Sequence, residues 1–294
     1  MSEITPVPSR ILDRLEEIGK RSRAKLKDAE VEHVRSLLPN WSDSVRRVPN
    51  IALRSALFGA MAKGERPYVE QSEIHAQGGI SILYTGVLLD QLDLDVWETV
   101  LHIARSQELG AECRITAYQL LKALDKTDTG KNRKILNGQL SRMKATALQL
   151  RVGDYSYEGS LINEVFREHG TRTKSYVIRL NPRLLKLFEG DQFTDVDWSV
   201  RQALRGKPIA KWLHGYYASH ANPFGLRIET LHRLCGSRAK SLDDFTVDLL
   251  KALESLVRAS SAAGQPFSYA IEGGLVRVRT TPSPSQRRHL AKKR

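Results

Sequence analysis

Apolar and polar positions alternate along the chain with spacings that predict helices and strands. In the first half, Val96, Val100 and Ile103 follow the i, i+4, i+7 spacing of an amphipathic helix over residues 95–106. Thr116 is a plausible N-cap for a short helix that follows a brief strand at Arg114-Ile115. The remaining expected elements are a long basic helix ending near residue 147 and strands at 148–152, 160–166 and 174–180.

The second half repeats this order. Its expected elements are a helix at 207–220, a strand at 227–228, a short helix at 229–235, a long helix at 241–260 and a hairpin at 266–280. The long helix carries Phe245, Leu249, Ala252 and Leu256 on one stripe, and Gly273-Gly274 suits the hairpin turn. Helix, strand, helix, helix and hairpin is the winged-helix order. The sequence therefore predicts an α+β fold with two tandem winged-helix domains.

The ends of the chain differ from this pattern. We expect a charged N-terminal arm and linker at 1–48, because Pro39 and Pro49 interrupt a polar stretch. The basic run 19–28 is either a solvated segment or an arm that lies on phosphates. The tail at 282–294 is basic and has little to bury, which predicts disorder. The winged-helix domains are then placed at 49–195 and 196–281.

Composition narrows the class of partner. Lys and Arg number 46 against 33 Asp and Glu, so the formal charge is +13 and the pI is near 9.8. The electrostatic field of this net positive charge attracts polyanions, and nucleic acid is favoured as the partner over an anionic membrane surface. Cys113 and Cys235 are the only cysteines and no secretory leader opens the chain, so we expect a reduced, cytoplasmic protein. The apolar run 80–89 is too short to span a bilayer and is expected to be a strand.

The long basic helix of the first half is the main candidate for binding DNA. At 100° per residue, Leu136, Leu140, Met143 and Ala147 form a buried stripe. The opposite face and its flanks carry candidate DNA contacts: Lys131, Arg133, Lys134, Asn137, Ser141, Arg142 and Lys144. In a major groove, Arg or Lys reads guanine and Asn reads adenine. The alternative is that these cations only make an exposed face soluble.

Gly138 is unusual inside this helix. Glycine costs about 0.5–1 kcal/mol relative to alanine at such a position. A groove wall or a partner backbone pressed against Gly138 would explain its presence.

Further cations lie near the expected wings and in the second half. The loop between the second and third strands of the first domain would be its wing, with Arg172 and Lys174 near the tip. In the second domain, Asp243 and Asp244 open the long helix and would repel a DNA backbone. The candidate contacts there are the cations that precede this helix: Arg227, Arg233, Arg238 and Lys240.

Motifs for catalysis are scarce. There is no phosphate-binding Gly-rich loop, HExxH or CxxC, so we expect no enzyme activity, no metal and no cofactor. His102 and Arg105 form an H-x-x-R string found in tyrosine recombinases, but the helical pattern places them on a helix surface or core edge. Trp212, Tyr216 and Tyr217 could stack on single-stranded bases, although their helical spacing favours core packing.

Several strings resemble the TrfA family of plasmid replication initiators, in order and approximate spacing across residues 41–280. They are RSALFG from Arg54, ILYTGVLL from Ile82, LSRMKATAL from Leu140, FEGDQFT from Phe188 and IETLHRLCGS from Ile228. The resemblance implies a tandem winged-helix initiator of plasmid DNA replication. Such a protein binds directly repeated origin sites (iterons), helps to melt an adjacent AT-rich segment into single strands and brings in the host helicase DnaB, often with DnaA. It also implies a monomer–dimer equilibrium linked to copy control.

The chain departs from the family pattern in two places. The region Glu32–Trp41 lacks the Gln and Phe of the segment that binds the sliding clamp, although Leu37 and Leu38 could fill the clamp pocket, so clamp binding is not expected. Asp243-Asp244 stands where lysines occur in the family, which questions how the second long helix meets DNA. The rival interpretation is a dimeric winged-helix transcription regulator that holds a palindromic operator without opening it.

Overall fold

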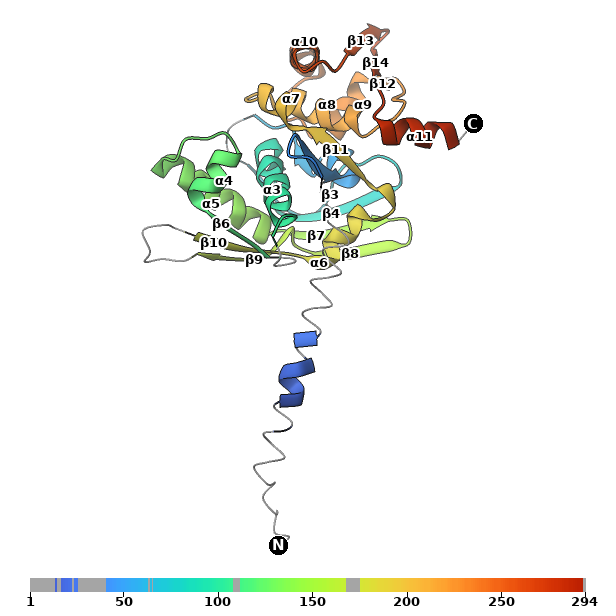
Figure 1. The fold of residues 1–294 in the computed structure, drawn as a ribbon. Coiled ribbons are helices and arrows are strands. Elements are labelled where there is room, and N and C mark those ends of the chain that lie inside the picture. Colours follow the sequence, from blue (N-terminus) through green and yellow to red (C-terminus); the bar gives the residue numbers. More distant parts are fainter. Residues whose placement is uncertain are drawn as a thin grey trace.

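The structure is a computed structural model with mixed α and β elements (Figure 1). It describes Arg14 and residues 17–22, 24–25, 41–62, 64, 66–107, 112–167 and 175–292. None of the helices in these ranges is both long and apolar enough to cross a membrane. The basic run 19–28 is described only in part, and the clamp-like region 32–41 lies outside the described residues except for Trp41.

The first half contains the expected order of elements: α3 (Gln91–Ala104), β6 (Glu112–Thr116), α4 (Ala117–Ala123), α5 (Gly130–Lys144), β9 (Ile162–Arg167) and β10 (Ser175–Leu180). The three strands form an antiparallel sheet in the order β6-β10-β9. Thr116 caps α4 as predicted, through a capping box with Gln119. Helix α3 begins earlier than expected, because the Asp90 side chain accepts from the backbone of Leu92 and Asp93.

A second sheet lies beside this unit, in the order β3-β4-β7-β8. Its strands are β3 (Tyr68–Glu73), β4 (Ile80–Val87), β7 (Ala147–Val152) and β8 (Tyr155–Gly159). The apolar run at 80–89 is therefore a strand, as predicted. The pattern did not predict β8, which is paired with β7 across the turn at Gly153. The hairpin β7–β8 is thus inserted between α5 and β9.

The segment 38–50 is not a simple connector. Its described part forms β1 (Val45–Pro49), which pairs antiparallel with β11 (Phe193–Asp197). Arg47 also forms a bidentate ion pair with Asp195, with N–O distances of 2.7 and 2.8 Å. This pairing joins distant parts of the chain, so local composition did not reveal it. The short elements nearby are α2 (Asn50–Leu53), β2 (Phe58–Gly59), β5 (Leu89–Asp90), α6 (Pro182–Leu185) and the 3₁₀ helix η1 (Lys186–Asp191).

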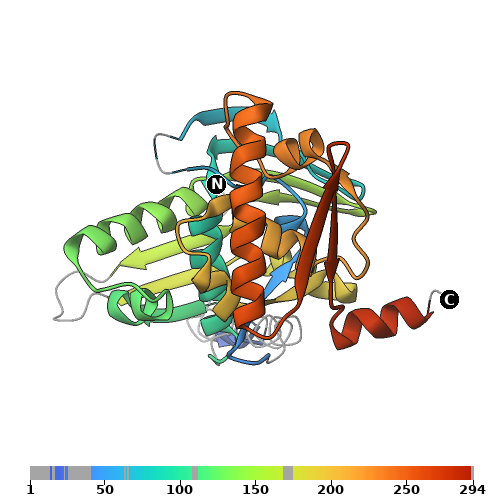
Figure 2. The same ribbon diagram turned by 90° about the horizontal axis from the view of Figure 1, so that it is seen from above.

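The second half repeats the element order of the first. It comprises α7 (Trp198–Ala203), α8 (Pro208–Ala218), β12 (Leu226–Arg227), α9 (Ile228–Leu234), α10 (Leu242–Ala262), β13 (Phe267–Glu272) and β14 (Leu275–Thr280). Its sheet order, β12-β14-β13, matches β6-β10-β9. Gly273 and Gly274 turn the hairpin with φ of 56° and 76°, a conformation that favours glycine. From above, α10 crosses the molecule beside this hairpin, and α5 lies at another edge (Figure 2).

Two hydrophobic clusters form the core. One gathers buried side chains from Trp41 to Val196, and the other gathers Ala60 and side chains from Val200 to Val278. Trp212, Tyr216 and Tyr217 are at most 2% exposed in the second cluster, which confirms core packing for these rings. The domain boundaries given above stay predictions.

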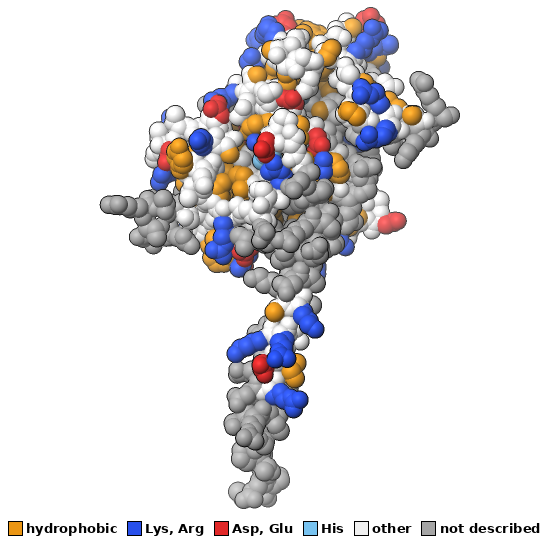
Figure 3. All heavy atoms as spheres, in the orientation of Figure 1, with side chains coloured by type: hydrophobic (Ala, Val, Ile, Leu, Met, Phe, Trp, Pro, Cys, Tyr) orange, Lys and Arg blue, Asp and Glu red, His pale blue; other side chains and the backbone are white. Residues whose placement is uncertain are grey.

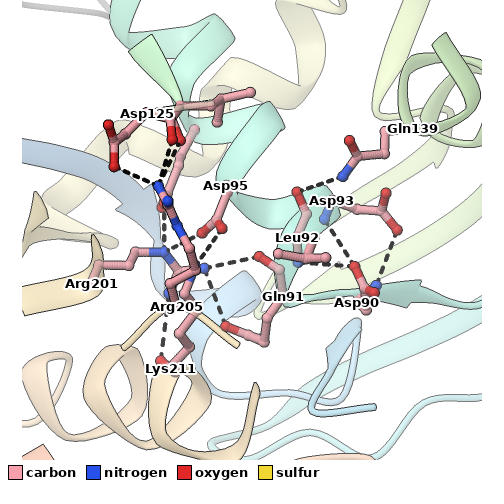
Figure 4. Close-up of polar contacts among 12 residues, drawn as sticks. Asp90, Gln91, Leu92, Asp93, Asp95, Asp125, Gln139, Arg201, Arg205 and Lys211 are labelled. Carbon is pink, nitrogen blue, oxygen red and sulfur yellow. Dashed lines mark hydrogen bonds and ion pairs between the residues drawn. The ribbon is translucent and has the colours of Figure 1, made fainter. Parts of the chain in front are cut away.

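A buried ionic cluster joins the two halves (Figure 4). The Arg201 guanidinium on α7 lies 2.8 Å from Asp95 and 2.7 Å from Glu98, both on α3. Lys211 on α8 donates to Asp95 at 2.5 Å. Burial raises the pKa of Glu98 to about 7, against the opposing effect of Arg201. Because all four side chains are buried and two of them come from each half, the contact favours a fixed arrangement of the halves.

The predicted disorder of the tail is not confirmed, since its described part forms α11 (Pro284–Lys292). Ser283 and Gln286 exchange reciprocal backbone-to-side-chain hydrogen bonds of 2.8 and 3.3 Å, which is a capping box. Gln286 Nε2 also donates to the carbonyl of Ala218 at 2.8 Å. These local bonds, rather than a large apolar face, account for the helix.

Candidate nucleic-acid interface

Helix α5 is fixed on one side and open on the other. Thr129 caps its N-terminus through a 3.2 Å bond from the Asn132 backbone. Its buried residues are Leu136, Gln139, Leu140 and Met143. Three of these belong to the predicted stripe, whereas Ala147 belongs to β7 and is exposed. Gln139 is buried because its amide donates to the carbonyl of Leu92 on α3 at 2.9 Å, which locks α5 against α3.

Three lysines of α5 are free to meet an anion. Lys131, Lys134 and Lys144 are exposed, and none of them forms an ion pair with the residues that the structure describes. Lys131 and Lys134 project from the face opposite the buried stripe, and Lys144 lies on the flank near β9. Unpaired ammonium groups on a fixed helix suit phosphate oxygens or a guanine edge.

Two arginines predicted to contact DNA already have partners within the chain. Arg133 forms a bidentate pair with Asp128, with N–O distances of 2.5 and 2.6 Å, and this hydrogen bonding lowers the pKa of Asp128. Arg142 donates to the buried Asp93 at 2.7 Å. Both guanidiniums are half-buried and position α5, and their contact with DNA stays a prediction.

Asn137 and Ser141 belong to a network that the sequence did not predict. Arg167, the last residue of β9, donates to Asn137 Oδ1 at 3.3 Å and to Ser141 Oγ at 3.0 Å. Tyr176 on β10 also donates to Asn137 Oδ1, at 2.8 Å. Arg167 and Tyr176 are paired residues of neighbouring strands. The sequence does show a cation, Arg167, at the end of the strand before the wing. Its contact with α5 was not predictable, because that contact depends on tertiary packing.

A shallow groove separates α5 from β9. It is lined by Ser141, Lys144, Glu164, Val165, Phe166 and Arg167. The Phe166 ring is 49% exposed, and the guanidinium of Arg179 lies 5.0 Å from its centroid. The Glu164 carboxylate is paired with Arg179 at 2.6 Å. Lys144 and Arg167 therefore provide positive charge along the groove. The Glu164 carboxylate is paired with Arg179, which also pairs with Glu112 at 2.8 Å.

Among the described residues, no neighbour of Gly138 requires glycine at this position. A Cβ built at this position would meet only Nη1 of Arg142 at 3.8 Å, an ordinary contact distance. Alanine would therefore fit the folded chain and favour the helix. The space outside Gly138 is open among the described residues, which agrees with the expected close approach of a partner.

The predicted wing residues Arg172 and Lys174 lie outside the described residues. In the second half, the predicted contacts Arg227, Arg233, Arg238 and Lys240 are all exposed. Figure 3 shows clusters of Lys and Arg at the top of the molecule, over α10 and the β13–β14 hairpin.

The outward face of α10 is different. Asp243 and Asp244 are exposed at its start, and Val247 and Leu250 are 51% and 39% exposed farther along. Acidic and apolar side chains do not suit a DNA backbone. The two cations of α10, Lys251 and Arg258, lie 3.9 Å from Asp248 and Glu254. The predicted contacts of the second half therefore lie beside α10.

His102 and Arg105 are structural residues of α3. The indole Nε1 of Trp41 donates to His102 Nδ1 at 3.0 Å, and Arg105 donates to the carbonyl of Trp41 and pairs with Asp43. Burial, followed by the nearby Arg46 and Arg105 charges, lowers the pKa of His102 to about 4. These contacts agree with the core-edge interpretation of the H-x-x-R string.

Comparisons with known proteins point to one family. A family model described as TrfA protein matches residues 15–263. The plasmid replication initiator protein TrfA of Escherichia coli is 29% identical over 222 residues, which cover 74% of this chain and 58% of that relative. The chain thus matches less than two thirds of the relative's length.

One solved structure shows a related fold. A crystal structure of domains 2 and 3 of RctB superposes with a TM-score of 0.50 and 13% identity, covering 75% of this chain and 95% of that one. A second crystal structure of RctB domains 2–3 gives a TM-score of 0.49 and 14% identity, with coverage of 78% and 96%.

Proposed function

Because this chain belongs to the TrfA protein family, we propose that it is a plasmid replication initiator that binds directly repeated sites in the origin. The single observation that carries this proposal is the outward face of α5, where unpaired lysines and fixed polar groups stand on a rigid helix. The repeated order of elements supports an interpretation of both halves as winged-helix modules. Two modules in one monomer suit a direct repeat, because each can face one major groove.

The remaining steps follow from the same proposal. Binding energy, without nucleotide hydrolysis, would open a neighbouring AT-rich segment, and the initiator would then recruit the host helicase DnaB together with DnaA. A monomer–dimer equilibrium would link binding to copy control. These events place the protein in the bacterial cytoplasm with its replicon. The exposed Arg227, Arg233, Arg238 and Lys240 would follow the DNA backbone beside the second half.

Footprinting across the origin of the protein's own replicon tests the proposal. A permanganate probe for unpaired thymines belongs in the same experiment. Protection of evenly spaced direct repeats, with reactive thymines beside them, is the expected result. Protection of one palindrome without reactive thymines would instead assign the protein to the class of dimeric transcription regulators.

A further inference from the structure

The amide of Asn137 is held in one orientation by two neighbouring side chains. The Nε–H of Arg167 can only donate, so the atom that faces it at 3.3 Å must be the Asn137 oxygen. The Tyr176 hydroxyl, at 2.8 Å, occupies the same oxygen. Both lone-pair positions of the amide oxygen are therefore engaged inside the protein.

The amide nitrogen is left available. Asn137 Nδ2 donates to no residue in the described part of the chain, and it is not among the buried unpartnered atoms of that part. Ser141 is similar, because its oxygen accepts from Arg167 Nη2 at 3.0 Å while its own O–H has no acceptor among the described residues. Lys131, Lys134 and Lys144 carry donors only. Among the described residues, Asn137, Ser141 and the three lysines thus each have a donor without an acceptor.

A donor-only amide cannot make the usual adenine contact. That contact needs the asparagine oxygen to accept from N6 while its nitrogen donates to N7. Guanine presents two acceptors, O6 and N7, on the same edge, whereas cytosine presents a donor. We infer that Asn137 reads guanine rather than adenine, and that Arg167 is the positioning residue that sets this preference by occupying the amide oxygen.

This inference rests on the proposed function, since it names the base that the same helix reads. The test therefore begins with the wild-type protein on a randomised duplex pool. The selected site is then re-synthesised with each of the four base pairs at every position, and binding is measured by fluorescence anisotropy. Asn137→Ala identifies the position that Asn137 reads, because discrimination is lost there and kept elsewhere.

Asn137→Asp is the decisive variant. An aspartate can still accept from Arg167 and Tyr176, so the network and the fold are kept, but its outward atom becomes an acceptor. Preference at the identified position should move from guanine to cytosine, by on the order of tenfold for a base contact of this kind. Replacing that guanine by 7-deazaguanine should weaken binding of the wild type and leave binding of Asn137→Ala unchanged.

The role of Arg167 is tested with the double variant Arg167→Ala, Tyr176→Phe. Freeing the amide oxygen should let Asn137 accept a hydrogen bond from N6 of adenine, so the preference for guanine should fall or reverse. Thermal unfolding of the double variant reports whether its fold is intact. If the double variant is unstable, Asn137→Asp alone decides the base polarity. A wild-type protein that selects no duplex would contradict the proposed function. A wild-type protein that binds but prefers adenine at this position, or an Asn137→Ala variant that changes discrimination nowhere, would overturn this inference only.

Discussion

Arg142 on α5 donates to Oδ1 of Asp93 on α3 at 2.7 Å, and Asp93 is fully buried. Arg66 approaches the other oxygen of the same carboxylate at 3.1 Å. The pair therefore connects the candidate recognition helix to the first helix of its module. Arg142 contributes to the position of α5 before any DNA is bound.

Charge reversal should separate this structural role from DNA binding. Arg142→Glu places a second carboxylate against Asp93, and disturbing a buried ion pair costs about 3–5 kcal/mol. Its urea unfolding midpoint should fall markedly. Lys134→Glu changes an exposed, unpaired side chain, so its midpoint should stay near that of the wild type while DNA binding is lost. Equal stability of the two variants would contradict the assigned role of Arg142.

Gly138→Ala should have opposite effects on stability and on binding. The new Cβ fits the folded chain, so the free energy of unfolding should rise by about 0.5–1 kcal/mol. If DNA lies against this face, the methyl group obstructs the closest approach and affinity falls. Ser261→Ala on the exposed last turn of α10 is the matched control, with no effect on affinity. Unchanged DNA affinity in Gly138→Ala would mean that nothing packs closely there.

The ionic cluster between the halves predicts a large loss of stability. Arg201→Met leaves the Asp95 and Glu98 carboxylates buried without their guanidinium partner, which should cost about 3–5 kcal/mol. Arg205→Met is the control, because its ion pair with Asp125 is exposed and is worth about 1 kcal/mol or less. Calorimetry should show a strongly lowered or split transition for Arg201→Met alone. Similar transitions for both variants would exclude the cluster as the link between the halves.

Acidification should destabilise the protein partly through His102. Its pKa is lowered to about 4 in the folded state by burial and by Arg46 and Arg105, against an ordinary value near 6.5. The unfolded chain therefore binds this proton first, so the stabilisation is complete above pH 6.5 and is lost as pH falls toward 4. His102→Gln, which can still accept from Trp41, should show a flatter loss of stability over this window. His75→Gln, an exposed histidine, provides the control. A pH profile of His102→Gln identical to the wild-type profile would contradict this assignment.

Helical periodicity was sufficient to predict α5 and its outward face. Lys131, Lys134 and Lys144 are exposed as expected, because the 3.6-residue repeat places them away from the buried stripe. The repeated order of elements was also readable, since its helices and hairpins are local. Long-range pairing was not readable, as β1 and β11 show.

The same limit applies to the partners of the site residues within the chain. Whether an arginine on a helix is free depends on what the rest of the chain brings to it. Asp93 reaches Arg142 from α3, and Arg167 reaches Asn137 from β9. The sequence does not reveal which residues these side chains contact, because each contact depends on how α5 packs against other elements.

The proposed function requires the outward face of α5 to hold duplex DNA through its lysines. The most direct test is the salt dependence of binding, measured by anisotropy for the wild type and for the triple variant Lys131→Ala, Lys134→Ala and Lys144→Ala. The slope of log K against log salt is negative, and each lost phosphate contact should make it less negative by about 0.9. Lys251→Ala with Arg258→Ala on α10 is the control, and its slope should match the wild type. A triple variant with the wild-type slope and affinity would contradict the account.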